Sequence, residues 1–454
     1  MMNFFNSSMA TATQRFLNYE MGRGHFENLR NVFSSSFISY CIIAIVAVFV
    51  AETLGLWFLQ NKLVIPIDRV DAAFWVYQLS VASFVVSFLS VPYDAVIIAH
   101  ERMSAFAYIS FVEVLGKLII AYLISISFMD KLVFYALLMW FVSIISRGVY
   151  VVYCKKHFKE CELQWVWKRE LFQKLFGFSG WMLIGTICNI FNTQGINMLI
   201  NIYFGPVLNA SRAISMQVYN AVNSFAANFM MATRPQIVKS YAQKNYVYMH
   251  KLVYTSSKFS FGLLFLLSIP LFFDTDYILL LWLKKIPESA DVFIQLTLMD
   301  SLITSAFSPL ATLSQASGRI RNYQLIISVG FLLIFLFSWL FYYWGYPVYY
   351  AFIVPICINL IGLYFRIWEL KCSQDFPMGI YLKRVVMPIC VTLVLTMASI
   401  KLIQTGLLET ASIMDFLMNN ILYVSIGLFL FWRITLDKME RKTIKEFVVK
   451  KIKR

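Results

Sequence analysis

The chain has 454 residues, of which 60% are hydrophobic and only 14% carry a charged side chain, and its formal net charge is +15. A soluble domain carries about 25% charged residues, so this composition excludes an ordinary soluble protein. The basic residues stand in short gaps between long apolar runs, an arrangement that argues against a nucleic-acid-binding surface.

Long apolar runs follow one another along the chain and predict an all-α polytopic membrane protein. About 20 consecutive apolar residues let a helix cross a bilayer, and a helix satisfies its own backbone groups in lipid. The period-two alternation of barrel strands is not seen. Residues 1–19 have the character of the end of a span. We expect twelve complete spans after them, at 37–59, 72–98, 104–129, 132–153, 175–203, 207–231, 252–282, 291–314, 322–344, 347–368, 383–404 and 413–433.

Lys and Arg gather on one side of this arrangement. When alternate loops are assigned to opposite sides, thirty of the 39 Lys and Arg residues fall on one side and six on the other. Such loops stay in the cytoplasm, so we expect a cytoplasmic C-terminus. The tail 437–454 is either a basic helix on the inner leaflet or a solvated tail.

A weak internal repeat relates the first part of the chain to a later part, 222 positions on. The matched segments lie six spans apart, so both copies should have the same orientation, related by an axis along the membrane normal.

We expect an incomplete first lobe (1–160), a second lobe (161–378), two additional helices (379–436) and the tail. The counterpart of 175–203 would precede residue 1, so about 50 N-terminal residues are expected to be missing. The identities pair Asn6, Met9, Ala10, Thr11, Gln14, Tyr19, Ser34 and Ser35 with Asn228, Met231, Ala232, Thr233, Gln236, Tyr241, Ser256 and Ser257.

Four segments carry a resemblance to a known family. They are MATATQRFLNYEMGRG (9–24), ETLGLWFL (52–59), SVPYDAVIIAHERMSAFAYI (90–109) and the stretch 194–242, which begins QGINMLINIYFGPVLNASRAISMQ. Together they resemble the Wzx-type polysaccharide flippases of Bacteroides-like bacteria, in the MATE/MOP exporter superfamily that also contains the lipid II flippase. The likeness covers nearly the whole chain except its N-terminus, where a span and a half of the family pattern is absent.

The resemblance implies a flippase of the bacterial inner membrane that works by alternating access between two lobes. Its substrate would be an undecaprenyl-pyrophosphate-linked oligosaccharide, such as an O-antigen unit, moved to the outer leaflet for polysaccharide biosynthesis. Implied partners are membrane lipids and polysaccharide polymerase or assembly proteins, with no cofactor. The alternative is a MATE-type multidrug antiporter. An enzyme is disfavoured because outer loops are short and all four His stand at inner ends of spans.

Ionisable residues inside spans are the first candidates for function, because burying them in a membrane is costly. Lys117 lies near the middle of its span with Glu113 one turn earlier. They are either a neutralised structural pair or a cavity cation whose partner exchanges for pyrophosphate. Arg147 and Arg212 either extend to the interface or face the cavity. We favour the interface for Arg147 and the cavity for Arg212.

Two polar stripes and two acids complete the candidates. Amides at helical spacing either join helices or line a water-filled cavity, and their number favours the cavity. Asp94 and Asp300 are candidates for coupling to a proton or Na⁺. Cys154, His157 and Cys161 have no evident fourth ligand, so no metal site is predicted. The stripes contain Asn189, Asn197 and Asn201 in one span, and Asn220 and Asn228 in the next.

Overall fold

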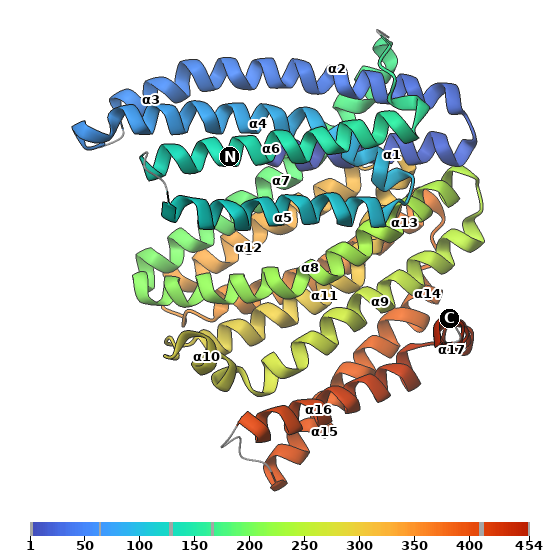
Figure 1. Cartoon of the computed structure of the whole chain (residues 1–454). Helices are drawn as coiled ribbons and strands as arrows, with labels where there is room; N and C mark the ends of the chain where they lie inside the picture. The colour runs from blue at the N-terminus through green and yellow to red at the C-terminus, as the bar shows by residue number, and fades with distance from the viewer. Residues whose placement is uncertain (1–2, 63–64, 127–129, 165–167, 408–412, 453–454) are drawn as a thin grey trace. The chain divides into compact units, whose positions relative to one another are not determined.

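The computed structural model describes residues 3–62, 65–126, 130–164, 168–407 and 413–452, and every regular element in them is a helix (Figure 1). Eleven of these helices are long and apolar enough to cross a membrane. Long runs of Leu, Ile, Val and Phe produce this result, because only helices satisfy their backbone in lipid. The fold class expected from the sequence is therefore confirmed.

The eleven candidate spans correspond to eleven of the twelve expected ones, and the twelfth is a special case. Residues 207–231 lie in α8 (Pro206–Ala242), which has 37 residues and is long enough to cross a bilayer. It is not among the eleven because polar residues interrupt its apolar run, among them Arg212, Asn220 and Asn228.

The first of two structural units contains residues 1–183 and 241–244. Its central helix is α4, which packs against α1, α2, α5 and α6. The long helices of this unit lie side by side (Figure 1). Its helices are α1 (Asn3–Arg23), α2 (Phe26–Val50), α3 (Leu56–Asn61), α4 (Val70–Ala99), α5 (Met103–Ile126), α6 (Lys131–His157) and the first part of α7 (Arg169–Phe204).

Small side chains allow α2 to pack closely within this unit. Ser34, Ser35, Ser36 and Ser39 are all fully buried, and small residues at helix contacts let backbones approach in membrane proteins. Ser39 satisfies its hydroxyl by donating to the Ser35 carbonyl at 2.8 Å. Two short 3₁₀ turns, η2 (Ile67–Arg69) and η3 (Lys159–Cys161), connect the longer helices.

The second unit contains residues 184–240 and 245–454. α11 is central here and packs against α9 and α13, while α13 also packs against α12 and α16 against α9. Its further helices are α9 (Tyr246–Phe273), α10 (Thr275–Leu283), α11 (Ala290–Ser317), α12 (Arg321–Tyr343), α13 (Tyr350–Gln374), α14 (Met378–Tyr381), α15 (Met387–Leu407), α16 (Ile413–Leu430) and α17 (Lys438–Ile452).

In the part of the chain that the structure describes, three π-helical turns widen helices. The first, η1 (Ala51–Gly55), joins α2 to α3, η4 (Leu382–Val386) joins α14 to α15, and η5 (Phe431–Thr435) follows α16. At the η1 turn the Ala51 carbonyl accepts the Leu56 backbone N–H and also a hydrogen bond from the Tyr77 hydroxyl at 2.6 Å. π-Helical turns are often found at functional sites.

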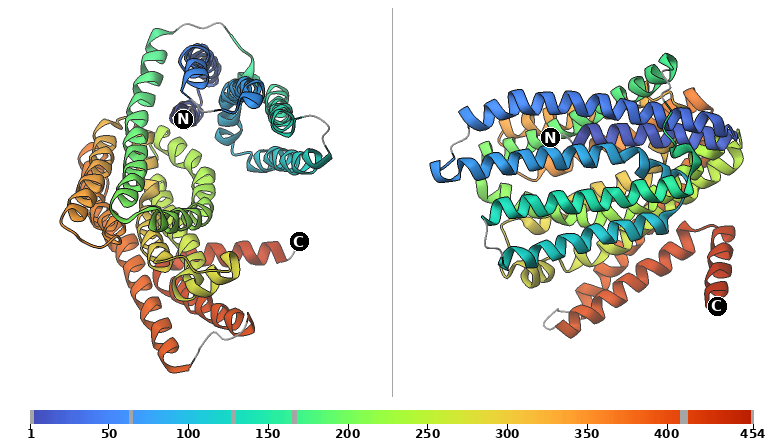
Figure 2. Two further views of the ribbon diagram at one scale, coloured as in Figure 1. Left: turned by 90° about the vertical axis from the view of Figure 1, so that its left-hand side faces the viewer. Right: turned by 45° about the horizontal axis from the view of Figure 1, so that its top comes forward.

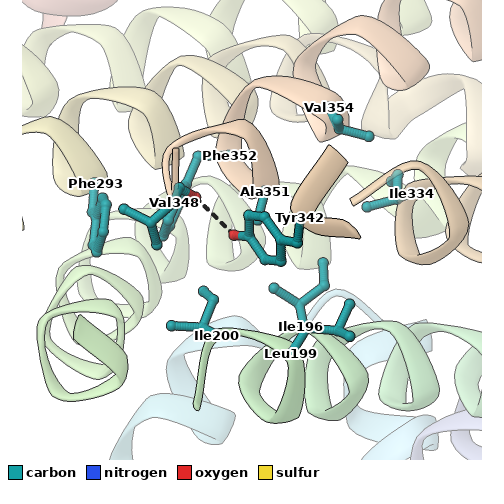
Figure 3. Close-up of a cluster of buried hydrophobic side chains, with 10 residues drawn as sticks. All are labelled: Ile196, Leu199, Ile200, Phe293, Ile334, Tyr342, Val348, Ala351, Phe352 and Val354. Carbon is teal, nitrogen blue, oxygen red and sulfur yellow. Dashed lines mark hydrogen bonds between the residues drawn. The ribbon is translucent and has the colours of Figure 1, made fainter. Parts of the chain in front are cut away.

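A core of aliphatic and aromatic side chains holds α7, α11, α12 and α13 together in the second unit (Figure 3). Tyr342 is buried in this cluster, and its hydroxyl donates to the Val348 carbonyl at 2.7 Å. Phe293 stacks on Phe352 with ring centroids 4.3 Å apart. The only polar group that Tyr342 brings into the core is therefore satisfied, as burial requires.

The same sequence of helix contacts occurs in both units. In the first, α2 packs on α4, α4 on α6 and α5 on α6; in the second, α9 packs on α11, α11 on α13 and α12 on α13. This agreement follows the repeat seen in the sequence and gives the chain two lobes of like construction. The domain boundaries expected from the sequence stay a prediction.

Candidate functional site

Four ionisable side chains of the first unit form one connected network. Lys117 Nζ lies 2.8 Å from Glu113 Oε1, and Arg147 Nη2 lies 3.2 Å from Glu113 Oε2. Arg147 Nη1 in turn lies 3.5 Å from Asp94 Oδ2. The expected Glu113–Lys117 pair is thus joined to Arg147 and Asp94, which the sequence analysis had considered separately.

Three helices position this network. Glu113 and Lys117 lie one turn apart on α5, where an acid followed by a base four residues later pairs favourably. Arg147 comes from α6 and Asp94 from α4, two residues after Pro92, which lies inside this continuous helix. Because α4 packs on α6 and α5 on α6, the Arg147 guanidinium meets both acids.

We expected Arg147 to extend to the membrane interface, and its guanidinium instead pairs with Asp94 and Glu113. Its side chain is 21% exposed and points between two carboxylates. In a medium of low dielectric constant an ion pair is worth far more than in water, so pairing prevails over the reach to the membrane surface.

Three members of the network, Glu113, Lys117 and Arg147, line a cavity of about 320 Å³. Serine hydroxyls from α4 and α6 add polar groups to its mostly apolar wall, and Ser87 Oγ lies 3.4 Å from Ser143 Oγ. Lys117 is the most accessible member of the network, with 51% of its side chain exposed. The sequence analysis missed the serines, although their spacing of three to four residues on one helix was a visible signal. They are Ser80, Ser83, Ser87, Ser143 and Ser146.

Asp94 has a second oxygen that takes no part in the ion pair. Its Oδ1 is buried and has no hydrogen-bond partner among the described residues. Because no donor in the described part of the chain contacts this oxygen, its lone pair is available for a proton or a small cation. Such a partner would be favourable, since a buried polar atom without a hydrogen bond costs free energy. The network therefore contains an accessible ammonium at Lys117 and, at Asp94, a carboxylate oxygen without a hydrogen bond from the described residues.

Arg212 forms a separate polar site in the second unit. It is 6% exposed and donates to the Thr193 carbonyl at 3.3 Å and to the Asn197 side-chain oxygen. Asn197 in turn donates to Gln194 at 3.3 Å. Among the described residues no carboxylate pairs with this guanidinium, so a buried positive charge is held by neutral groups alone.

Asp300 enters a third cluster, also in the second unit. Asn359 of α13 donates to Asp300 of α11 at 2.7 Å, and Arg366 donates to Asn359 at 3.5 Å. Arg366 and Asn359 also line a mostly apolar pocket of about 310 Å³ between α12 and α13. Arg366 lies sixteen residues after the start of α13, and Arg147 lies sixteen residues after the start of α6.

The remaining amide candidates lie on open helix faces. Asn189 and Asn201 on α7 are exposed, and so are Asn220 and Asn228 on α8. They do not join the three clusters described above. Ser224 lies between the latter two and is exposed as well, so α8 presents a polar stripe to its surroundings.

The Cys and His residues at the end of α6 have other partners. His157 stacks on Tyr153 with ring centroids 4.2 Å apart, and Cys154 Sγ lies 3.5 Å from the Tyr93 carbonyl. Within the described ranges, no group of three or more His, Cys, Asp or Glu side chains is placed to hold a metal ion.

Comparison with known proteins identifies the fold. No family model matches the sequence, and no curated protein matches it either. A MATE transporter crystallised in a bent conformation superposes with a TM-score of 0.70 at 12% identity, covering 82% of this chain and 85% of that one. An outward-facing multidrug resistance MATE transporter of the MOP superfamily gives 0.64 at 12% identity, covering 83% and 85%.

A third structure is a MOP superfamily transporter from Pyrococcus furiosus, described as having a binding pocket of reversed polarity. It superposes with a TM-score of 0.64 at 13% identity and covers 81% of this chain and 84% of that one. At such low identity the likeness concerns the fold. This chain is a multi-span membrane protein with the two-lobed fold of MATE and MOP superfamily transporters.

Proposed function

We propose that this protein is an alternating-access transporter that flips an anionic lipid-linked substrate, an undecaprenyl-pyrophosphate-linked oligosaccharide, between membrane leaflets. The MATE-like fold supports a transporter, and the resemblance of 9–24, 52–59, 90–109 and 194–242 to Wzx-type flippases supports this substrate. In this proposal the protein resides in the bacterial inner membrane with its C-terminus in the cytoplasm, where lipid-linked oligosaccharides are made.

The observation that carries the proposal is the buried charge of Arg212. A guanidinium held only by a carbonyl and an amide in low dielectric is uncompensated. Guanidinium groups bind phosphate oxygens in a bidentate geometry, so an anion is the partner that would relieve this cost. In the first unit, the accessible ammonium of Lys117 is a separate candidate for contact with phosphate, since its present partner Glu113 is also hydrogen-bonded to Arg147.

Transport in proteoliposomes tests the proposal directly. The full chain is reconstituted with a lipid-linked oligosaccharide, and protection of the glycan from an external glycosidase reports flipping. We expect Arg212→Gln to slow flipping about tenfold or more, because one charge-assisted contact is lost, and Arg212→Lys to retain part of the rate. Arg319→Gln removes an exposed Arg outside the clusters and is the matched control.

Cells provide the complementary result. A strain without its own flippase should regain surface polysaccharide when it expresses this protein. Continued accumulation of lipid-linked oligosaccharide on the inner leaflet, with the protein correctly inserted, would overturn the proposed substrate.

A second candidate function is export of cationic amphiphiles. It is favoured by the two carboxylates of the network, Asp94 and Glu113, and by the multidrug transporter among the similar structures. In this case Asp94→Asn should abolish drug resistance conferred by the protein, whereas Arg212→Gln should leave it intact. Loss of glycan flipping in Arg212→Gln, with flipping retained in Asp94→Asn, would instead support the anionic substrate.

A further inference from the structure

A cavity of about 810 Å³ lies between α9, α14 and the C-terminal helix α17, entirely within the second unit. Its walls come from the first residues of the span Tyr246–Phe273, from the start of the span Met378–Gln404, and from the residues that follow the span Ile413–Thr435. Three spans begin or end here, so this tail cavity opens at a membrane surface. The π-helical turn η4 contributes Arg384 to its wall.

A buried lysine fixes α17 over the cavity. Lys258 of α9 is fully buried, and its Nζ lies 3.0 Å from Asp437 and 2.9 Å from Glu440. Glu440 also accepts from the Asp437 backbone N–H at 2.8 Å, which completes the N-terminal cap of α17. Thr255 donates to Glu440 at 2.9 Å. Figure 2 shows the result, with α17 turned away from the direction of α15 and α16.

The charge that remains for a ligand is positive. The two acids that line the cavity, Asp437 and Glu440, are both engaged by Lys258. Lys251, Arg384 and Lys438 also line it, and none of them has an ion-pair partner among the described residues. Three free cations around one cavity attract an anion, and phosphate is the anion that both Lys and Arg bind well.

The rim of the cavity indicates that this anion belongs to a lipid. Val247 is 84% exposed, Met439 is 70% exposed and Ile380 is 48% exposed, and all three border the cations. Tyr248 and Tyr254 add aromatic rings with hydroxyls, the kind of residue that gathers at the headgroup level of a membrane. Apolar side chains beside a cationic pocket match acyl chains beside a phosphate.

We propose that the tail cavity binds the phosphate headgroup of an anionic phospholipid of the bilayer in which the protein resides. Lys251, Arg384 and Lys438 contact the phosphate, the apolar rim contacts the acyl chains, and Lys258 is a positioning residue that holds α17 in place. This site is separate from the polar clusters of the proposed transport path and does not depend on the identity of the transported substrate.

The test measures phospholipid retention by the purified full-length protein. Native mass spectrometry counts phosphatidylglycerol and phosphatidylcholine bound after delipidation and titration. The double variant Lys251→Gln/Arg384→Gln should bind phosphatidylglycerol about tenfold or more weakly, since each basic residue near a membrane surface contributes to attraction of anionic lipid. Phosphatidylcholine should bind weakly to every form of the protein.

A matched control removes the same charge elsewhere. Lys383→Gln/Lys445→Gln neutralises two exposed lysines, one next to Arg384 and one on α17, neither of which lines the cavity. Its phosphatidylglycerol affinity should equal that of the unaltered protein. An equal loss in both double variants would show general surface attraction and overturn the proposal. Inorganic phosphate or glycerol phosphate that binds as well as the lipid, and displaces it, would assign the cavity to a soluble anion instead.

Discussion

Arg147 is the residue on which the charge network of the first unit depends, because it contacts both Asp94 and Glu113. Arg147→Gln removes the positive charge that pairs with two partly buried carboxylates. Breaking a buried ion pair costs about 3–5 kcal/mol, and we expect about 2 kcal/mol here since the three side chains keep 21–26% exposure. Thermal unfolding in detergent measures the loss.

The double variant Asp94→Asn/Arg147→Gln gives the control for this prediction. It removes one charge of each sign, so it should recover more than half of the lost stability. Two single variants whose costs simply add would mean that the two side chains do not interact.

Glu160 provides a pH dependence outside the spans. Burial acts to raise the pKa of Glu160, but the hydrogen bond from His100, a backbone N–H and the His100 charge outweigh it, and the pKa lies below the ordinary value of 4.5. A carboxyl with a depressed pKa in the folded state stabilises the fold above its unfolded pKa. This contribution is lost as the pH falls through the folded pKa.

Stability of the unaltered protein should therefore decrease as the pH falls below about 4.5, and Glu160→Gln should flatten this part of the profile. Melting temperatures from pH 3 to 7, as read by tryptophan fluorescence, check it. A variant with the same slope as the unaltered protein would exclude Glu160 as the titrating group. Glu162→Gln is a suitable comparison, because Glu162 is an exposed neighbour in the same loop, with 66% of its side chain accessible.

At the scale of elements, the contact between α7 and α12 depends on the absence of a side chain. A Cβ at Gly195 would stand 2.6 Å from the ring of Phe335, which also packs on Phe191. Gly195→Ala should therefore destabilise the second unit by about 1–3 kcal/mol, the usual cost of overpacking. Gly180→Ala on the same helix meets nothing within 4 Å and should be neutral or slightly stabilising. Equal melting temperatures for the two variants would contradict this packing.

The position of α17 against α9 depends on Lys258. Lys258→Met leaves Glu440 almost buried without a cation, while Asp437, at 56% exposure, can turn to solvent. We expect a cost of about 2 kcal/mol, concentrated on the tail helix. Hydrogen exchange should show faster exchange in 438–452 and little change in α11. Addition of Glu440→Gln should restore slow exchange, and failure to do so would mean that the lysine does not hold the helix.

At the scale of the whole molecule, the distribution of Lys and Arg makes a prediction about orientation. Thirty of 39 such residues fall on one side, so a fluorescent protein fused to the C-terminus should fold and fluoresce in the cytoplasm. Alkaline phosphatase at the same place should be inactive. Active phosphatase there would reverse the proposed direction of every span.

The membrane fold was readily predicted, because apolar length is a local property that one sequence displays. α8 shows where this method reaches its limit, since Arg212, Asn220 and Asn228 lower its apolarity without preventing a helix of 37 residues. The repeat was also visible, and the order of helix contacts follows it.

The sequence identified single candidate residues of the site, but it did not predict which of them contact one another across helices. Lys117 and Glu113 share a helix, so their pairing follows from spacing. The contacts of Arg147 with Asp94 and Glu113 join three helices, and no local pattern states which faces meet. Lys258 was missed for the same reason, because its partners lie 179 and 182 positions away in the chain.

The charge network of the first unit has a consequence for the energetics of a transport cycle. With two cations and two carboxylates it is electrically neutral, so an entering pyrophosphate adds net negative charge to a region of low dielectric constant. Proton uptake by a displaced carboxylate would return the site toward neutrality. Under the proposed function, the energetic cost of uncompensated charge thus favours coupling of each translocated headgroup to proton movement, and flipping in proteoliposomes should respond to an imposed pH gradient.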